Sequence, residues 1–239
     1  MQSRSVLRFL GFTSAALLLA AAAQAQTAIG SGNNVAFPIV INESGSYKLS
    51  RNLTVPAGSH GILVGNGIDV TIDLNGFALI GGATCSKAAG CAGPHTTVGI
   101  RVGNSSARIV NGAINGFNAN GIGYDSGAPY AKLSVDSVNV SRNFNGIVAL
   151  YLLATRVTAS DNAHRGIQTS DGVVANSLAV GNGDAGIVVQ VGSVQGNTAL
   201  YNNKGFILGA VAYDGNVAIS NNAGNSKAGS AVSGGNVGL

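Results

Sequence analysis

The chain has 239 residues, with 36 Gly and 25 Asn but only 13 Lys and Arg, 9 Asp and Glu, and no Trp. Glu43 is the only Glu, which excludes coiled coils and long-helix proteins because they need Glu, Lys, Ala and Leu in quantity. Gly follows no three-residue period, which excludes collagen, and 46% apolar residues exclude a disordered chain. The composition therefore leaves a globular or repeat protein, and the chain is long enough to bury a core.

The first 25 residues are typical of a secretory signal peptide. Arg4 and Arg8 form a basic start, residues 9–23 form an apolar run, and Ala23-Gln24-Ala25 matches an A-x-A cleavage site. The alternative is a membrane anchor, which needs about 20 apolar residues. We therefore expect an exported protein, secreted or periplasmic, with no membrane contact after signal removal and one domain over residues 26–239.

Signal removal also changes the charge. Without Arg4 and Arg8, 11 basic residues stand against 9 acidic ones, so the mature chain carries about +2. A nucleic-acid partner needs a basic patch, and this balance supplies none. We expect no nucleic-acid partner.

The two cysteines, Cys85 and Cys91, lie six positions apart in the loop-like stretch TCSKAAGCAGP. Because disulfides persist in exported proteins, we expect these two residues to pair with each other. Such a small ring stiffens its loop more than it stabilises the fold. A metal site is the alternative, but neither thiol has an adjacent His at ligand spacing, the nearest being His95.

A Gly-Ile step recurs through the chain at intervals close to 20 residues or twice that length. Its Gly positions are Gly61, Gly99, Gly121, Gly146, Gly166, Gly186 and Gly205, the last followed by Phe206. A column of Asn has the same period, at Asn143, Asn162, Asn182, Asn202 and Asn221. A fixed period of this size is the signature of a solenoid.

The residues after each Gly alternate in character, as a strand requires. The first and third positions are mostly aliphatic, as in Ile187 and Val189, and we expect both to face inward. A second short apolar run precedes each Asn, as in residues 178–180. Asn, Gly and Ser at the junctions tolerate the left-handed conformations of tight corners. About 20 residues then form three short strands and three corners, and successive coils stack by parallel pairing at about 4.8 Å.

Two stretches, Val70–Phe77 (VTIDLNGF) and Ile109–Phe117 (IVNGAINGF), resemble the right-handed parallel β-helix proteins of the pectin lyase-like superfamily. The likeness extends from about residue 39, where Gly45–Leu49 looks like an opening coil, to about residue 222. We therefore expect an all-β fold, a single-stranded right-handed parallel β-helix of eight or nine coils of about 20 residues. The resemblance implies that the Asn column stacks as a hydrogen-bonded ladder, with simple turn preference as the alternative.

In members of this superfamily that cleave polygalacturonate, the resemblance implies outward Asp residues, or calcium bound by Asp together with Arg or Lys. The outward positions two and four residues after each Gly hold one carboxylate, Asp125. Glycoside hydrolysis commonly needs a carboxyl pair about 5 to 10 Å apart, and calcium needs several oxygen ligands. We expect no paired-carboxylate hydrolase, no metal site and no cofactor, since calcium finds no ligand cluster.

The strongest polar cluster lies just before the repeating Gly. If the coils stack in register, His164 lies beside Asp184, with Arg165 and Lys204 close by. A His oriented by a carboxylate, with cations to stabilise an enolate, suits proton abstraction in a lyase or epimerase, so these four are candidate catalytic residues. The alternative is that they are solvated corner residues.

Two excursions interrupt the repeat, near residues 82–98 and 124–132. Both flank the Gly-Ile strand of neighbouring coils, and we expect them to form one wall over the same face. Candidate sugar-binding residues there are Tyr124, Asp125, Tyr130, Lys87 and His95. The alternative is a pair of tolerated surface insertions.

An apolar outward stripe, Val148, Val188 and Ile207, suggests a homo-oligomer or a protein partner. The tail, residues 223–239, is rich in Gly, Ser and Asn and caps the last coil poorly. The sequence therefore favours a secreted protein that engages a polysaccharide, by binding or by lyase or epimerase chemistry. The alternative is a noncatalytic structural, adhesion or protein-interaction role at the cell surface.

Overall fold

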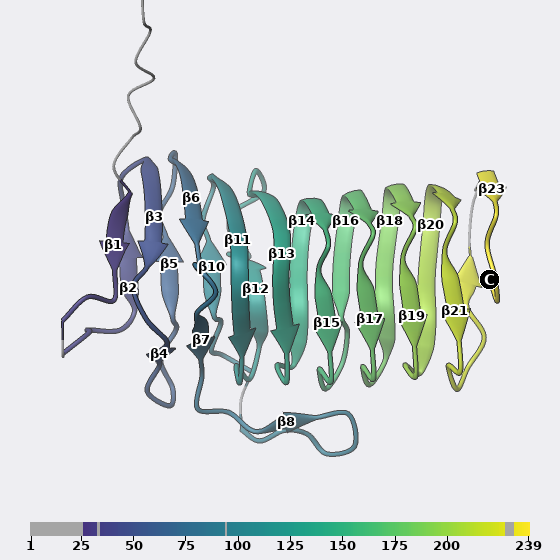
Figure 1. The fold of residues 1–239 in the computed structure, drawn as a ribbon, viewed down its shortest axis with the longest axis horizontal. Helices are drawn as coiled ribbons and strands as arrows, with labels where there is room; N and C mark the ends of the chain where they lie inside the picture. The colour runs from purple at the N-terminus through teal and green to yellow at the C-terminus, as the bar shows by residue number, and fades with distance from the viewer. Residues whose placement is uncertain (1–25, 33, 94, 228–231) are drawn as a thin grey trace, which may run out of the picture.

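The structure, a computed structural model, describes residues 26–32, 34–93, 95–227 and 232–239, and its regular elements in these ranges are all strands (Figure 1). The expected signal peptide, residues 1–25, and residues 228–231 of the expected tail lie outside the described residues. The expectation of an all-β fold is confirmed. Within the described ranges, no helix is long and apolar enough to cross a membrane.

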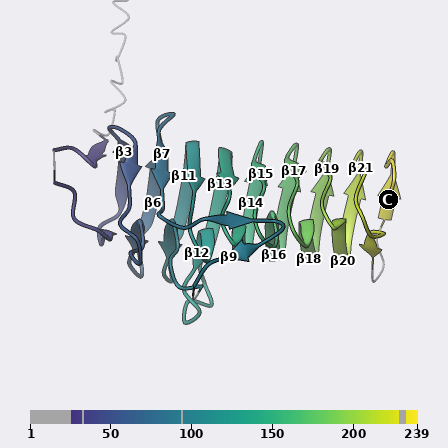
Figure 2. The ribbon, with the colours of Figure 1, turned by 90° about the horizontal axis from the view of Figure 1, so that it is seen from below.

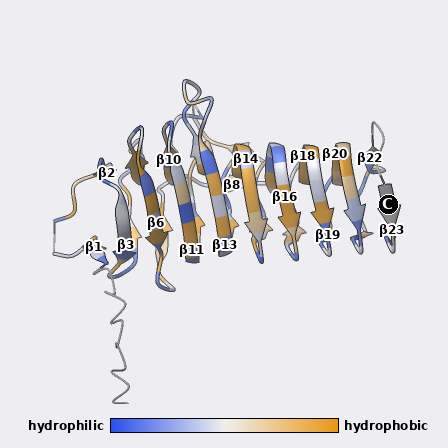
Figure 3. Ribbon diagram, turned by 90° about the horizontal axis from the view of Figure 1, so that it is seen from above, coloured by the Kyte–Doolittle hydropathy of each residue, from blue (hydrophilic) through white to orange (hydrophobic). Residues whose placement is uncertain are grey.

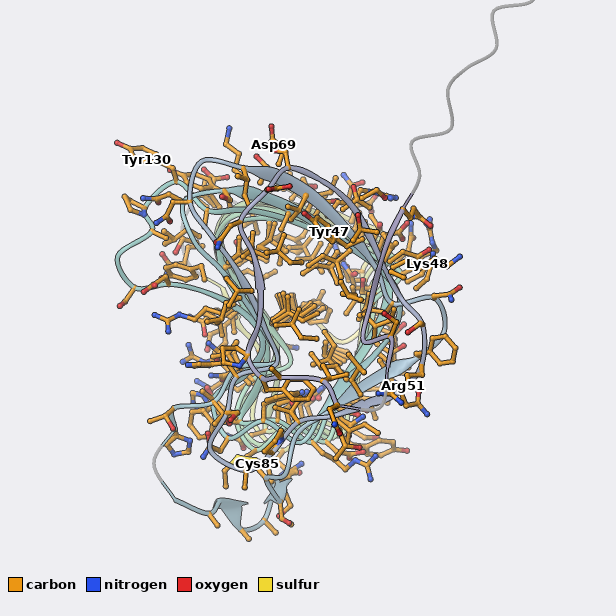
Figure 4. All side chains as sticks on the ribbon, turned by 90° about the vertical axis from the view of Figure 1, so that its left-hand side faces the viewer. Tyr47, Lys48, Arg51, Asp69, Cys85 and Tyr130 are labelled. Carbon is orange, nitrogen blue, oxygen red and sulfur yellow. A yellow bond between two sulfur atoms is a disulfide. The ribbon has the colours of Figure 1, made fainter. Side chains whose placement is uncertain are left out.

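Twenty-one strands form one sheet whose strands run parallel and curl round an axis (Figures 1 and 4). They are β1 (Thr27–Ile29), β2 (Ile39–Ile41), β3 (Gly45–Leu49), β4 (Leu53–Thr54), β5 (Ile62–Val64), β6 (Asp69–Asp73), β7 (Ala78–Ile80), β10 (Ile100–Val102), β11 (Ser106–Asn115), β12 (Asn120–Tyr124), β13 (Lys132–Ser141), β14 (Asn145–Thr155), β15 (Thr158–Ser160), β16 (Ile167–Ala175), β17 (Leu178–Val180), β18 (Ala185–Gln195), β19 (Thr198–Leu200), β20 (Lys204–Asp214), β21 (Val217–Ile219), β22 (Ser226–Lys227) and β23 (Val232–Gly234). The other two strands, β8 (Cys85–Ser86) and β9 (Gly90–Cys91), form an antiparallel hairpin.

The register follows the sequence repeat. Ile147 pairs with Ile167, Ile167 with Ile187, and Ile187 with Phe206, so the residue after each repeating Gly stacks on its counterpart one period later. Ile39 also belongs to this column because it pairs with Ile62. The predicted parallel stacking of residues about 20 positions apart is confirmed.

The core lies inside the curl and is built from the first and third residues after each Gly. Ile62, Ile100, Ile187 and Val189 are fully buried, as is Phe206. Burying an aliphatic or aromatic side chain contributes about 2 to 3 kcal/mol. The view along the axis in Figure 4 shows side chains pointing into the interior. The predicted inward columns are confirmed.

The repeating Gly is required by close approach between neighbouring repeats. A Cβ on Gly186 would lie 2.7 Å from the carbonyl oxygen of Gly205 and 2.8 Å from Nδ2 of Asn202. A Cβ on Gly166 would lie 2.5 Å from the carbonyl oxygen of Gly186. Both separations are well below van der Waals contact, so a side chain there would force the backbones apart.

The Asn column is a buried hydrogen-bonded ladder. Asn143, Asn162, Asn182 and Asn202 are fully buried. Nδ2 of Asn182 donates to Oδ1 of Asn202 at 2.9 Å and to the carbonyl of Ala159 at 3.0 Å, and the backbone N–H of Asn182 donates to the same Oδ1 at 2.9 Å. The ladder, rather than turn preference alone, explains the column.

A second ladder, not anticipated from the sequence, runs through another corner. The Ser177 backbone N–H donates to Oδ1 of Asn197. The backbone N–H and Nδ2 of Asn197 both donate to Oδ1 of Asn216, and the same two groups of Asn216 donate to Oδ1 of Asn236. Each ladder residue follows a residue with positive φ, such as Asn176 (φ 50°) or Tyr201 (φ 56°). The left-handed residue turns the corner and the next residue points its side chain inward, where the amide satisfies backbone groups that water cannot reach.

The two excursions leave the body at opposite ends of β12. Residues 82–98 reach the start of β12, where the ring of His95 meets the carbonyl of Asn118, and residues 124–132 follow its end. Figure 1 shows the β8–β9 hairpin below the body and no excursion joining it from the other end of β12. The expected single wall over one face is therefore wrong, because the two loops sit at different corners. The expected Cys85–Cys91 disulfide is confirmed.

Candidate functional site

The register brings three members of the expected corner cluster together. The His164 backbone N–H donates to the carbonyl of Phe144 at 2.8 Å, and the Asp184 N–H donates to the carbonyl of His164 at 2.7 Å. These bonds stack the corners before β14, β16 and β18, so side chains 20 positions apart become neighbours. Asp184 Oδ2 lies 2.9 Å from Arg165 Nε and 3.4 Å from His164 Nε2. We name His164, Arg165 and Asp184 the corner cluster.

Both ring nitrogens of His164 have partners. Nδ1 lies 3.1 Å from Asn145 Oδ1, an oxygen that also accepts the backbone N–H of Arg165. Oδ1 of Asn145 and the Asp184 carboxylate are both acceptors, so each ring nitrogen of His164 faces a group that accepts a hydrogen bond. A general base needs a nitrogen open to the substrate. The corner cluster offers one only if Asp184 moves aside.

The pKa of His164 is lowered, first by burial, then by the positive charge of Arg165, while Asp184 raises it and His95 lowers it further. The neutral ring is therefore favoured at neutral pH. Arg165 is held in place at both ends of its guanidinium, since Nη1 also donates to Gln168 Oε1 at 2.9 Å.

His95, expected as a sugar-binding residue, instead joins the corner cluster. Its ring centroid lies 3.9 Å from that of Phe144, and Phe144 also stacks on His164 at 5.2 Å with an interplanar angle of 14°. The contact between His95 and Phe144 links the excursion to the body. No sequence repeat could have revealed this contact, because His95 lies outside the repeat.

Lys204 lies one position along from the corner cluster, where it pairs with Ala185 and its backbone N–H donates to the carbonyl of Asp184 at 2.7 Å. The structure gives its ammonium no ion pair with Asp184 among the described residues. Lys204 therefore contributes a positive charge beside the corner cluster but forms no direct contact with its carboxylate.

The other candidate sugar-binding residues are dispersed. Lys87 Nζ donates to the carbonyl of Tyr201 at 2.5 Å, and Tyr130 is 73% exposed on the excursion at the far end of β12 (Figure 4). Asp125 pairs with Arg101 at 2.7 Å, and this hydrogen bond lowers the pKa of the Asp125 carboxyl. Tyr124 closes β12 next to that pair. These residues do not form one sugar-binding surface.

An open groove of about 650 Å³, which sequence reasoning missed, crosses the outer face of β3, β6, β11 and β13. Register places Asp69, Ser106 and Lys132 in one outward row. A second row holds Ser46, Thr71, Arg108 and Ser134. Hydroxyl groups and three charged groups thus share one face. We name these seven residues the outer groove.

The charged groups of the outer groove are available to a ligand. Among the described residues, the Lys132 ammonium and the Asp69 carboxylate have no hydrogen-bond or ion-pair partner. Arg108 is only loosely paired, at 3.7 Å from Asp136 Oδ2, because Arg156 holds that oxygen at 2.6 Å. Figure 4 shows Asp69 pointing away from the axis. Asp69 and Ser106 are 37 residues apart, and Ser106 and Lys132 are 26 residues apart. Because neither spacing matches the 20-residue period, the row could not be recognised in the sequence.

The outward stripe expected from Val148, Val188 and Ile207 is interrupted by Gln168, which pairs with both Val148 and Val188, and Val188 is only 5% exposed. Three of the large apolar side chains that reach solvent instead continue the rows of the outer groove. Tyr151 pairs with Lys132 and Leu153 with Ser134, and both are more than two-fifths exposed, as is Val191. Figure 3 shows the change along the sheet, from blue segments on β11 to a mostly orange β14 and β20.

Across residues 26–32, 34–93, 95–227 and 232–239, no group of three or more His, Cys, Asp or Glu side chains gathers as a metal site would. Comparison with protein-family models, with curated proteins and with solved structures finds no match to this chain. The functional argument therefore rests on the geometry of the molecule.

Proposed function

We propose that the chain is a single-stranded right-handed parallel β-helix of eight or nine coils, exported from the cell and related to the pectin lyase-like superfamily. The column that contains Ile39 and Phe206 has eight members among the described residues, which supports this number of coils. The disulfide between Cys85 and Cys91 supports export, because such bonds persist in oxidising compartments.

The function is noncatalytic binding of an extended polysaccharide that carries carboxylates. The observation that supports it is the outer groove, an open channel across four strands whose lining includes hydroxyl and charged groups. Ser and Thr hydroxyls donate to and accept from sugar hydroxyls, and Arg and Lys donate strong charge-assisted bonds to carboxylates. Two cationic groups, Arg108 and Lys132, outnumber Asp69 and favour an acidic polymer.

Binding has better support than lyase or epimerase chemistry. At the corner cluster His164 has both ring nitrogens occupied, whereas the outer groove has an unpaired ammonium and an unpaired carboxylate facing solvent. A polymer lying along the axis would meet a new pair of outward side chains about every 4.8 Å.

Affinity electrophoresis in gels containing polyuronates or neutral polysaccharides tests this function. The wild-type protein is expected to be retarded by acidic polymers, and Arg108→Ala with Lys132→Ala is expected to abolish the retardation. The matched control removes two cations elsewhere, by Arg165→Ala with Lys204→Ala, and keeps it. No retardation of the wild type by any polymer overturns polysaccharide binding, and loss only in the control variant moves the site to the corner cluster.

A second candidate function is protein association, favoured by the exposed side chains of Tyr151, Leu153 and Val191 on one sheet face. Apolar groups gathered on a surface mark interaction sites when they form a contiguous patch. Size-exclusion chromatography with light scattering at high concentration tests it. A strict monomer, unchanged by Leu153→Ser, contradicts self-association through this face.

A further inference from the structure

The first row of the outer groove continues beyond the groove itself. The groove lining ends at β13 with Lys132, Leu133 and Ser134. Register then pairs Lys132 with Tyr151 on β14, and Tyr151 with Asp171 on β16. These two further positions extend the row by two strands, or roughly 10 Å at the usual strand spacing.

The three side chains at this end of the row are available to a ligand. Tyr151 is 44% exposed, and Lys132 and Asp171 are exposed as well. Among the described residues, the Tyr151 hydroxyl and the Asp171 carboxylate have no hydrogen-bond or ion-pair partner, as is the case for the Lys132 ammonium. A cation, an aromatic ring and a carboxylate therefore follow one another on adjacent strands.

The row lies on the side of the body away from the β8–β9 hairpin. Figure 2 shows the hairpin lying across the underside of the body. Figure 4 places Asp69, which begins the row, and Cys85 of the hairpin on opposite sides of the axis. A long polymer can therefore follow the row without meeting the hairpin.

The cations alone do not distinguish one polyanion from another. A charge-assisted bond from Lys132 or Arg108 to a carboxylate does not depend on the molecule that carries the carboxylate. An aromatic ring adds a requirement, because its face carries partial negative charge and packs against the C–H groups on the flat side of a sugar ring. A chain of glutamates offers no such ring. Tyr151 can therefore select for acidic sugars.

The charges on either side of Tyr151 also set the orientation of such a ring. We propose that Tyr151 is the stacking platform for one uronate ring of the bound polymer, with the carboxylate edge toward Lys132 and the hydroxyl edge toward Asp171. The proposal rests on the polysaccharide binding proposed above and adds selection of sugar rings over other polyanions. A reversed ring would bring its carboxylate toward Asp171, and the two negative charges would repel each other.

The same charged neighbours argue against a protein contact centred on Tyr151. Lys and Asp are depleted at the core of protein interfaces, whereas Tyr151 has one of each on the two adjacent strands. A uronate ring uses all three side chains, because it presents a carboxylate, an apolar face and hydroxyl groups.

Calorimetric titration of the full chain with an oligouronate, and with an oligoglutamate of equal charge, tests the proposal. Tyr151→Ala is expected to weaken oligouronate binding about fivefold to tenfold, as loss of one aromatic contact does. The weaker binding of oligoglutamate is expected to stay unchanged. Tyr151→Phe keeps the ring and the wild-type affinity. The matched control is Tyr201→Ala, which removes a ring that is 59% exposed beyond β19 and leaves both affinities unchanged.

Tyrosine fluorescence reports the contact itself, because the chain has no Trp. Oligouronate is expected to change the emission of the wild-type protein. Most of this change is expected to be absent from Tyr151→Phe, which still binds with unchanged affinity. An equal change in that variant overturns the proposal, since the ligand would then affect other tyrosines.

Asp171→Ala tests the orientation. This variant loses an acceptor for sugar hydroxyls and is expected to weaken oligouronate binding. It also loses a negative charge, so it is expected to strengthen oligoglutamate binding. A change in the same direction for both ligands overturns the proposed orientation.

The outcomes separate this proposal from the function on which it rests. Unchanged oligouronate affinity in Tyr151→Ala, while Lys132→Ala still weakens it, overturns the stacking platform and leaves polysaccharide binding in place. No oligouronate binding by the wild type overturns the proposed function instead. Loss of a dimer in Tyr151→Ala at unchanged oligouronate affinity, measured by light scattering, overturns the platform and assigns the ring to protein association.

Discussion

Asn182 is expected to be among the residues whose removal costs the most stability. Asn182→Ala removes the donors to Ala159 and Asn202 and leaves the amide of Asn162 without its acceptor, all in a fully buried corner. Each buried polar group left unpaired costs about 1 to 3 kcal/mol. We expect the free energy of unfolding to fall by about 3 kcal/mol, measured by urea denaturation at unchanged m value.

Asn203→Ala is the matched control for Asn182→Ala. Asn203 lies at the same corner one period later and is half-buried. Its side chain forms no hydrogen bond with the residues that the structure describes. Its substitution should change the free energy of unfolding by no more than about 0.5 kcal/mol. Equal losses in the two variants would contradict the structural role of the ladder.

At single positions, the sequence predicted the repeating Gly and the first Asn column, but not every reason for them. The spacing marks Gly186, whereas its cause, the approach of Gly205 and Asn202, appears only when the repeats are stacked. The second ladder, Asn197, Asn216 and Asn236, had the same spacing in the sequence and could have been found by the same comparison. Tyr201 and Arg156 at positive φ could not, because neither residue type favours that conformation.

Among the elements, the body strands followed from alternation and period, while the excursion at residues 82–93 and 95–98, which we call the arm, did not. Period-two patterns placed Ile187 and Val189 inward, since stacked neighbours present the same pattern. The position of the arm depends on contacts with Phe144 and Tyr201, and such contacts leave no trace in a repeat. The corner cluster could be predicted from the sequence because its members belong to the repeat. The contact of His95 with Phe144 could not, because His95 lies outside the repeat.

The arm itself carries a prediction about the disulfide. Cys85 and Cys91 close a ring of only a few residues, so reducing them removes at most about 2 kcal/mol of chain-entropy stabilisation. We expect reductant to leave the urea midpoint of the body nearly unchanged and to abolish amide protection in residues 82–93. A large fall of the body midpoint on reduction would show instead that the disulfide stabilises the stacked strands.

At the scale of the whole molecule, the stacked register is what creates the outer groove. Asp69, Ser106 and Lys132 are separated by the arm and by the excursion at residues 124–132, yet they lie in one row on adjacent strands. Because these insertions displace the period, a column read from the sequence misses the row. Beyond the outer groove, the exposed side chains of Tyr151 and Leu153 continue the same two rows.

The central claim, that an acidic polysaccharide lies along the outer groove, is tested most directly by calorimetric titration with oligouronates of increasing length. Four strands span roughly 14 Å at the usual strand spacing. Affinity is expected to rise with oligomer length until the oligomer covers this span and then to stay constant, and Lys132→Ala is expected to weaken every member of the series. No binding at any length, or affinity that neither depends on length nor responds to Lys132→Ala, would contradict the claim.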